Sequence, residues 1–393
     1  MQRPALPILV AILIVAGLAY AVWSLSDADS NSRALAFSLG LGAVFGAVLQ
    51  RSRFCFYCHT REFLEERDPR GVLAILLALA VGAVGYLVVF GAWLPVPAPE
   101  RLPPTAHIGP VSWVLGLAAF VFGVGMAVSG SCISAHFYRL GEGSPTAPFA
   151  LIGTAAGFGA GFLSWNWLYL TSISAAPVVW FPHQLGYGGA IALTLAVLVA
   201  LALAVLRASR VKLAPPAAAS LDLDHVARAM FVQRWPAYVG GLAVGVLSAV
   251  AYLRVAPLGV TAELGSLTRT AADQLALLPS TLHGLDGFRG CATVVKQALL
   301  SNNGLFVGGL VLASFASALV SGEFKPRKPR FDEIWRGLLG GLLMGWGAMV
   351  ALGCTVGVLL SGIHAGALSG WVFLAFCFAG VAAGVWARRR FAF

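Results

Sequence analysis

GVGMAVSGSC (123–132) and GWGAMVALGC (345–354) are the two stretches that decide how this 393-residue chain is interpreted. They align without gaps and place Cys132 on Cys354. Each one closes an apolar run, and each loosens the helix with Gly or Ser just before the thiol. A broken helix in hydrocarbon leaves backbone N–H and C=O groups unpaired, at several kcal/mol each, so such breaks need a protein-covered or polar surrounding.

The composition is that of a membrane protein. Hydrophobic residues make up 59% of the chain and charged residues 11%, whereas soluble domains have about a quarter of their residues charged. We predict an all-α polytopic membrane protein with about nine or ten transmembrane helices and the bilayer as its main solvent. The apolar runs lie near 6–23, 34–50, 71–93, 111–130, 146–165, 188–207, 237–253, 303–321, 336–353 and 368–387, and interrupted pieces remain at 54–64, 131–144, 257–300 and 354–367.

The formal net charge of +10 comes largely from four basic groups. They follow the second run, lie in or beside the linker 208–235, precede the ninth run and follow the tenth. If every run crosses the membrane in turn, all four groups share one side. The positive-inside rule then makes both termini cytoplasmic and removes the reason to expect nucleic acid. The run 6–23 lacks a strong basic n-region and a cleavage site, so we interpret it as a retained span.

The two aligned stretches cross in opposite directions by this count. The first runs from outside to inside and the second from inside to outside, which predicts an inverted-topology repeat with a substrate site at the repeat interface. A chance alignment of Gly-rich helices is the alternative. The predicted regions are an N-terminal extra helix and loop (1–33), a first repeat (34–207), a cytoplasmic linker (208–235) and a second, inverted repeat (236–393).

The breaks themselves are the candidate binding sites. A helix that starts after a break offers free N–H groups and the positive end of its dipole, and both favour an anion. The alternative is that Gly and Ser ease helix packing while Cys acts as a small buried hydrophobe. The candidate path residues are Gly130, Ser131 and Cys132 at the first break, Gly353, Cys354 and Thr355 at the second, and Cys55 and Cys291 elsewhere.

Other chemistries have weaker signals. Cys55 and Cys58 form a C-x-x-C that, with His59, supplies only three soft ligands, so we predict no metal site. The same pair supports an alternative function, a membrane thiol–disulfide oxidoreductase that exchanges electrons with a quinone. A third hypothesis is a membrane anchor subunit that binds haem, although the His residues do not occur in pairs on facing spans as haem ligation would need. No phosphate-binding loop occurs, and we predict no cofactor. His136 and His364 fit a vestibule or a helix interface equally well.

Four motifs are similar to those of a known family: RSRFCF (51–56), GVGMAVSGSC (123–132), PLGVT (257–261), and GWGAMVALGC with TVGVLLSGI (345–363). Together they resemble the YeeE/YedE sulfur-transport proteins. The resemblance implies a bacterial inner-membrane protein, not an enzyme, that takes up thiosulfate or a related sulfur or selenium species. It also implies an hourglass shape with short re-entrant helices and loops dipping to the centre, and a path lined by Cys55, Cys132 and Cys354. A small soluble sulfur-carrier protein on the cytoplasmic side is left open as a partner.

Such a substrate suits the residues. Thiosulfate is a small dianion with a terminal sulfur, and thiols are weak donors and soft acceptors that can pass it on without holding it tightly. We expect Cys132 and Cys354 to face each other across the path, with Cys55 nearer one mouth.

Overall fold

A computed structural model describes residues 5–27, 29–98, 100–210, 223–279, 281–288, 293–296 and 300–391. Within these ranges the chain is almost entirely helical and forms only isolated β-bridges, without a named strand. In the described part of the chain, nine helices are long and apolar enough to cross a membrane, or ten if one bent pair counts as a span. The predicted all-α polytopic membrane fold is therefore confirmed.

Each apolar run of the sequence corresponds to one long helix. These are α1 (Ala5–Ser26), α2 (Ser30–Ser52), α4 (Arg70–Trp93), α5 (Trp113–Ser129), α7 (Ala147–Leu168), α8 (Phe181–Ala208), α10 (Ala237–Arg254), α12 (Asn302–Ser321), α13 (Phe331–Val350) and α15 (Leu368–Phe391).

The interrupted pieces contain shorter helical segments, and the linker contains one. These are α3 (Phe56–Glu66), α6 (Ile133–Gly141), α9 (Leu223–Phe231), α11 (Val260–Gln274), the π-helical η3 (Thr355–Ser361) and α14 (Gly362–His364); a π-helical turn η1 (Tyr169–Ile173) extends α7, and a 3₁₀ turn η2 spans Leu285–Gly287.

Glycines spaced four residues apart bring the long helices into backbone contact. A Cβ atom on Gly42 or Gly46 of α2 would collide with the α12 backbone, and one on Gly241 or Gly245 of α10 would collide with α4. The same spacing joins α7 to α13 through Gly153 and Gly157. Small residues at these positions let membrane helices approach closely, which is how such helices gain packing energy without a hydrophobic driving force.

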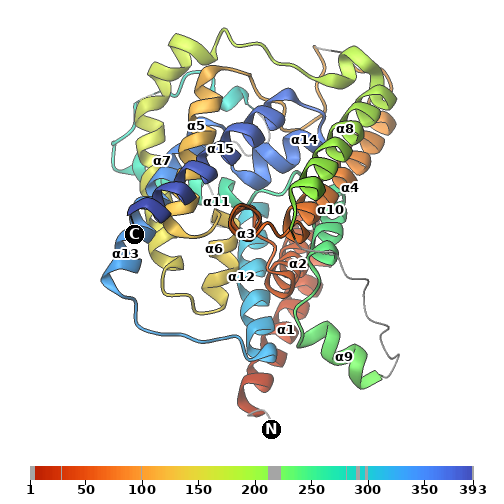
Figure 1. Cartoon of the computed structure of the whole chain (residues 1–393), viewed down its shortest axis with the longest axis vertical. Helices are drawn as coiled ribbons and strands as arrows, with labels where there is room; N and C mark the ends of the chain where they lie inside the picture. Colours follow the sequence, from red (N-terminus) through yellow and green to blue (C-terminus); the bar gives the residue numbers. More distant parts are fainter. Residues whose placement is uncertain are drawn as a thin grey trace.

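The two halves of the chain share one core. Helices α2 and α4 of the first half pack against α12 and α10 of the second, while α5 packs against α13 and α15, and α7 against α13 (Figure 1). By contrast, α1 contacts only α2 and α12 among the elements with substantial contacts and leaves most of its apolar surface exposed. That exposure is expected of a helix that faces lipid.

The described residues of all four basic groups lie at one end of the bundle. Backbone and side-chain contacts tie the groups that follow α2, α8, α12 and α15 to one another. These contacts are Arg210 N to Arg67 O (3.3 Å), Trp235 N to Arg51 O (2.9 Å), Lys325 N to Glu142 O (3.3 Å) and Arg389 to Glu65 (3.4 Å). We call this end, which also carries Arg53 and Glu323, the basic end.

Candidate functional site

The first break lies between α5 and α6, as the sequence predicts. Gly130 adopts a left-handed conformation (φ 85°) and donates its N–H to Met126 O at 2.9 Å, which ends α5. Cys132 is extended and serves as the N-cap of α6. A Cβ atom at Gly130 would meet nothing within 4 Å, so glycine is needed there for its backbone conformation rather than for space.

The second break follows α13 and also ends in the aligned cysteine. Leu352 has φ 62°, a conformation that is uncommon for a residue with a branched side chain. Cys354 is extended, and its Sγ accepts a hydrogen bond from Val356 N at 3.4 Å. The segment that follows bends away from α13 by 43° and is π-helical, whereas α6 is an ordinary α-helix. The two breaks therefore match in position but differ in the helix type that follows.

A third short helix also begins at a cysteine, and its thiol reaches the first break. Cys55 is the N-cap of α3, and its Sγ lies 3.6 Å from Cys132 Sγ. Cys132 Sγ is also 3.2 Å from the hydroxyl of Ser134. Both thiols are almost fully buried and free. Two thiols from different short helices thus meet inside the protein.

This thiol pair lines a pocket to which both halves of the chain contribute. Ser134 and Thr355 supply hydroxyl groups, so a residue of the second break faces the thiols at the first. None of the described residues that line the pocket is charged; the others are Phe45, Leu49, Phe54, Phe56, Ile75, Val244, Val356, Leu359 and Leu360.

The remaining candidates are more dispersed. Cys354 is buried in the core but does not line this pocket, and no hydrogen-bond-length contact joins it to Cys132. We expected Cys132 to face Cys354, but the thiol that contacts Cys132 is that of Cys55. Gly353 lines a second pocket with Thr261 and Thr293. Ser131 is fully buried, and its hydroxyl has no hydrogen-bond partner among the described residues. Cys291 lies outside the described residues.

His136, His364 and Cys377 pack between helices. His136 Nε2 lies 3.2 Å from Ser129 Oγ, and the ring of His364 lies between Ser248 Oγ (3.1 Å) and Ala78 O (3.2 Å). Both rings are buried at helix contacts. Cys377 is fully buried in the core where α15 approaches α5, which agrees with its interpretation as a packing residue.

Sequence reasoning overlooked one charged residue beside the thiols. Arg139 of α6 donates from Nη2 to Cys58 Sγ at 3.3 Å. It follows Cys132 by seven residues, two helical turns, so both side chains share one face of the helix. Its charge therefore lies close to the thiols, although the lining of their pocket carries none. The signal was available, since a charged residue inside an apolar segment is a functional candidate by default.

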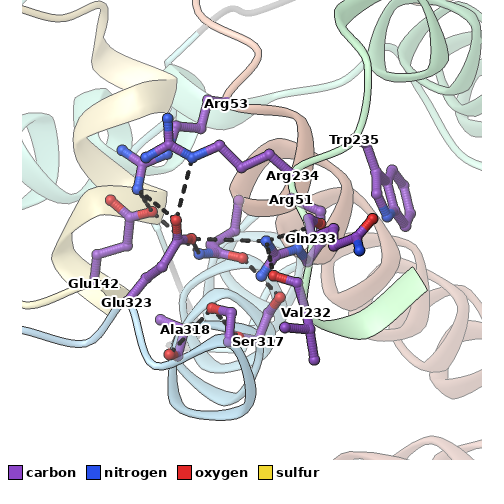
Figure 2. A network of polar contacts seen from close by, with 12 residues as sticks. Arg51, Arg53, Glu142, Val232, Gln233, Arg234, Trp235, Ser317, Ala318 and Glu323 are labelled. Atoms are coloured by element: carbon purple, nitrogen blue, oxygen red, sulfur yellow. Dashed lines mark hydrogen bonds and ion pairs between the residues drawn. The ribbon is translucent and has the colours of Figure 1, made fainter. Parts of the chain in front are cut away.

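Beyond the thiols, at the basic end, charged side chains form a compact network (Figure 2). Glu323 accepts from Gln50 (2.8 Å), Arg53 (3.2 Å) and Arg234 (3.3 Å). Burial raises the pKa of Glu323, but the positive charge of Arg53 and these hydrogen bonds outweigh it and leave the pKa below its usual value. The pKa of Glu142 is raised by burial, although Arg53 lies 3.5 Å away.

Residues 51–383 match the profile of a protein family described as sulphur transport. The matched span contains both breaks and the Cys55–Cys132 pair. This chain belongs to the sulphur transport family. Two relatives named thiosulfate transporter TsuA are each 28% identical to it. The one from Spirochaeta thermophila aligns over 84% of this chain and 92% of its own length, and the one from Escherichia coli over 88% and 92%.

A more distant relative, the probable transporter YedE of Escherichia coli, is 27% identical over 42% of this chain and 39% of its own length. The family and these relatives are transporters, so the chain is a multi-pass membrane transport protein and not an enzyme. The predicted family is confirmed, and the oxidoreductase alternative is set aside.

Proposed function

We propose that this member of the sulphur transport family takes up thiosulfate, or a closely related sulfur anion, across a bacterial inner membrane. The observation that carries the proposal is the Cys55–Cys132 contact of 3.6 Å inside a pocket formed by both halves of the chain. The two relatives that align over most of this chain are named for thiosulfate.

The path runs through both breaks. An anion enters the pocket beside Gly353, passes the buried Cys354 and Thr355, and reaches the pocket of Cys132 and Cys55. At each step a thiol or hydroxyl donates weakly to the sulfur or oxygen atoms, and the amides at the start of α6 replace part of the lost water. Weak donors suit conduction because a site that binds a dianion tightly would not release it.

Matched helix pairs support the inverted repeat. The α2–α12 contact has a counterpart in α10–α4, and the α5–α15 contact has one in α13–α7. If α2, α4, α5 and α7 correspond in order to α10, α12, α13 and α15, each pair is exchanged with its counterpart by a single two-fold operation. The thiol pocket would then lie at the repeat interface, where transporters of this type bind substrate.

The basic end faces the cytoplasm in this proposal, together with both ends of the chain, because arginine- and lysine-rich loops remain inside. A small soluble sulfur-carrier protein would collect the anion at this end. The concentration of four basic groups there supports this orientation.

Uptake of radiolabelled thiosulfate into cells that lack other sulfur importers tests the proposal. Cys132→Ala should reduce uptake by about a hundredfold, because the remaining donors cannot bridge the pocket. Cys377→Ala removes an equally buried thiol that lies near Cys354 but does not line the pocket of Cys132, and it should leave uptake within about twofold of the unmodified protein. Normal uptake by Cys132→Ala at equal membrane expression would refute the thiol path.

A further inference from the structure

We propose that Arg139, together with Tyr138 and Cys58, forms a second oxyanion site between the thiol pair and the basic end. This inference rests on the proposed function, because its ligand is the transported sulfur oxyanion. Nothing in the family match or in the named relatives assigns a role to these three residues.

Two short helices create the site. Cys55 begins α3 and Cys132 begins α6, and their thiols touch. Farther along the same two helices the side chains meet again, where Arg139 donates to Cys58 at 3.3 Å. The α6 chain then reaches Glu142, whose carbonyl accepts from Lys325 at the basic end. Arg139 therefore lies about 10 Å along α6 from Cys132, on the side where the path leaves the bundle.

The polar groups of this site are short of partners. Arg139 forms no ion pair within the described part of the chain, and its buried Nε has no hydrogen-bond partner there. The hydroxyl of the fully buried Tyr138 also forms no hydrogen bond of normal length and angle there, and it lies close to the Arg139 guanidinium. Leaving a buried donor unpaired costs free energy, and more for a charged group. Two adjacent residues therefore have buried N–H and O–H groups that could donate hydrogen bonds to a ligand.

The neighbouring charges do not cancel Arg139. Glu142, the C-cap of α6, interacts electrostatically with Arg139, but its carboxylate contacts Arg53 (3.5 Å) and Gln50 (3.2 Å) instead. The phenol of Tyr138, the ring of His136 and the thiols of Cys55 and Cys58 also lie close enough to interact electrostatically with the guanidinium. The site is therefore positively charged and bordered by soft sulfur atoms.

This combination fits an anion that has both oxygens and a terminal sulfur. A guanidinium presents its N–H donors in a planar fork that matches two oxygens of an oxyanion. The terminal sulfur can then lie against Cys58, a weak donor of the same softness as the thiols already passed. No bond is made or broken; the anion moves from a neutral pair of thiols to a cation that neutralises part of its charge.

Thiosulfate uptake kinetics test this site. Arg139→Lys keeps the charge but loses the fork, so we expect the KM to rise about tenfold at equal membrane expression. Arg336→Lys is the matched control, because Arg336 also lies toward the basic end but donates to Val128 O instead of a thiol. Its KM should stay within about twofold of the unmodified protein.

A second measurement needs no variant. In the purified protein, saturating thiosulfate should slow iodoacetamide labelling of Cys58 by about fivefold, read by mass spectrometry, and sulfate at equal concentration should protect it less.

If Arg139→Lys does not fold, Tyr138→Phe should still raise KM about threefold. Unchanged KM in the folded variants, or unprotected Cys58, would overturn the inference while wild-type uptake persists. If the unmodified protein did not take up thiosulfate at all, the proposed function itself would be refuted.

Discussion

The carboxylate of Glu323 forms ion pairs with several arginines at the basic end. It lies 3.8 Å from Arg51, whose side chain is 3% exposed, and it also pairs with Arg53 and Arg234. The buried guanidinium of Arg51 further donates to the carbonyls of Val232 and Gln233 at 3.1 Å. One acidic side chain therefore joins the end of α2 to the segment that leads into the second half.

Replacing this carboxylate should destabilise the protein. Glu323→Gln removes the countercharge of the buried Arg51, and we expect a loss of about 2 kcal/mol, less than for a fully buried pair because Glu323 is partly exposed. Thermal unfolding in detergent measures the effect. Glu66→Gln, at an exposed position on the same end, should change stability by less than about 0.5 kcal/mol.

The pH dependence of this difference follows from the sign of the pKa shift. The pKa of Glu323 is lower in the folded protein than its usual value of 4.5. Its contribution is therefore fully present above pH 4.5 and is lost as the pH falls through the folded pKa. The stability difference between the unmodified protein and Glu323→Gln should be full at pH 7 and shrink below pH 4.5. A difference that stays constant into acid would contradict this reading.

Among the site residues, the sequence indicates the thiols better than their partners. Cys132 and Cys354 stand out because the two stretches align on them, and both begin helical segments. The contact between Cys55 and Cys132 could not be read from spacing, since it depends on how α3 packs beside α6. Arg139 was overlooked although it is a charged residue inside an apolar piece, and its contact with Cys58 depends on the same packing of α3 beside α6.

At the scale of the elements, helix ends follow local signals. Ser112 caps α5 by accepting from Leu115 N at 3.3 Å, and Gly130 ends the same helix in a left-handed turn. Both residue types are recognisable in the sequence. The π-helical η3 was not predictable, because Thr355–Ser361 has no pattern that distinguishes a wider helix from an α-helix. The hydroxyl of Ser361 bonds to Val356 O, five residues back, which suits the wider turn.

Two glycines of α7 allow the effect of helix–helix packing on stability to be measured separately from the effect of helix propensity. A Cβ at Gly157 would collide with Leu342 O of α13, while one at Gly159 would meet nothing within 4 Å. Gly157→Ala should therefore cost about 1–3 kcal/mol through overpacking. Gly159→Ala should be neutral or stabilise by up to about 1 kcal/mol through helix propensity. Melting temperatures of both variants in detergent check this, and equal destabilisation by the two would exclude the close α7–α13 contact.

On the scale of the whole molecule, the halves depend on each other. The linker separates them in sequence, but α2, α4, α5 and α7 each pack against helices of the second half. Composition and run lengths were enough to predict the number and places of the long helices. Which helices contact one another could not be predicted, because each apolar run could pack against many others. The choice depends on how the glycine-containing faces fit together in three dimensions.

Such interdependence predicts the behaviour of a split protein. If the chain is cut between residues 215 and 216 and both fragments are co-expressed, they should assemble and restore at least roughly half of the uptake, because the glycine-mediated contacts need no connecting segment. Either fragment alone should give no uptake. Co-purification through a tag on one fragment measures assembly, and a functional first fragment without the second would contradict the shared core.

The faces of α2 and α4 that pack against α12 and α10 also impose an order of events on biosynthesis. At roughly 5–20 residues per second, both helices enter the bilayer well before their partners have left the ribosome. The face of α4 is covered first, when α10 is made; the face of α2 waits for α12, and α5 gains its last partner only with α15. Until then the nascent protein exposes these packing faces to lipid, so we expect protection of them during insertion to favour correct assembly.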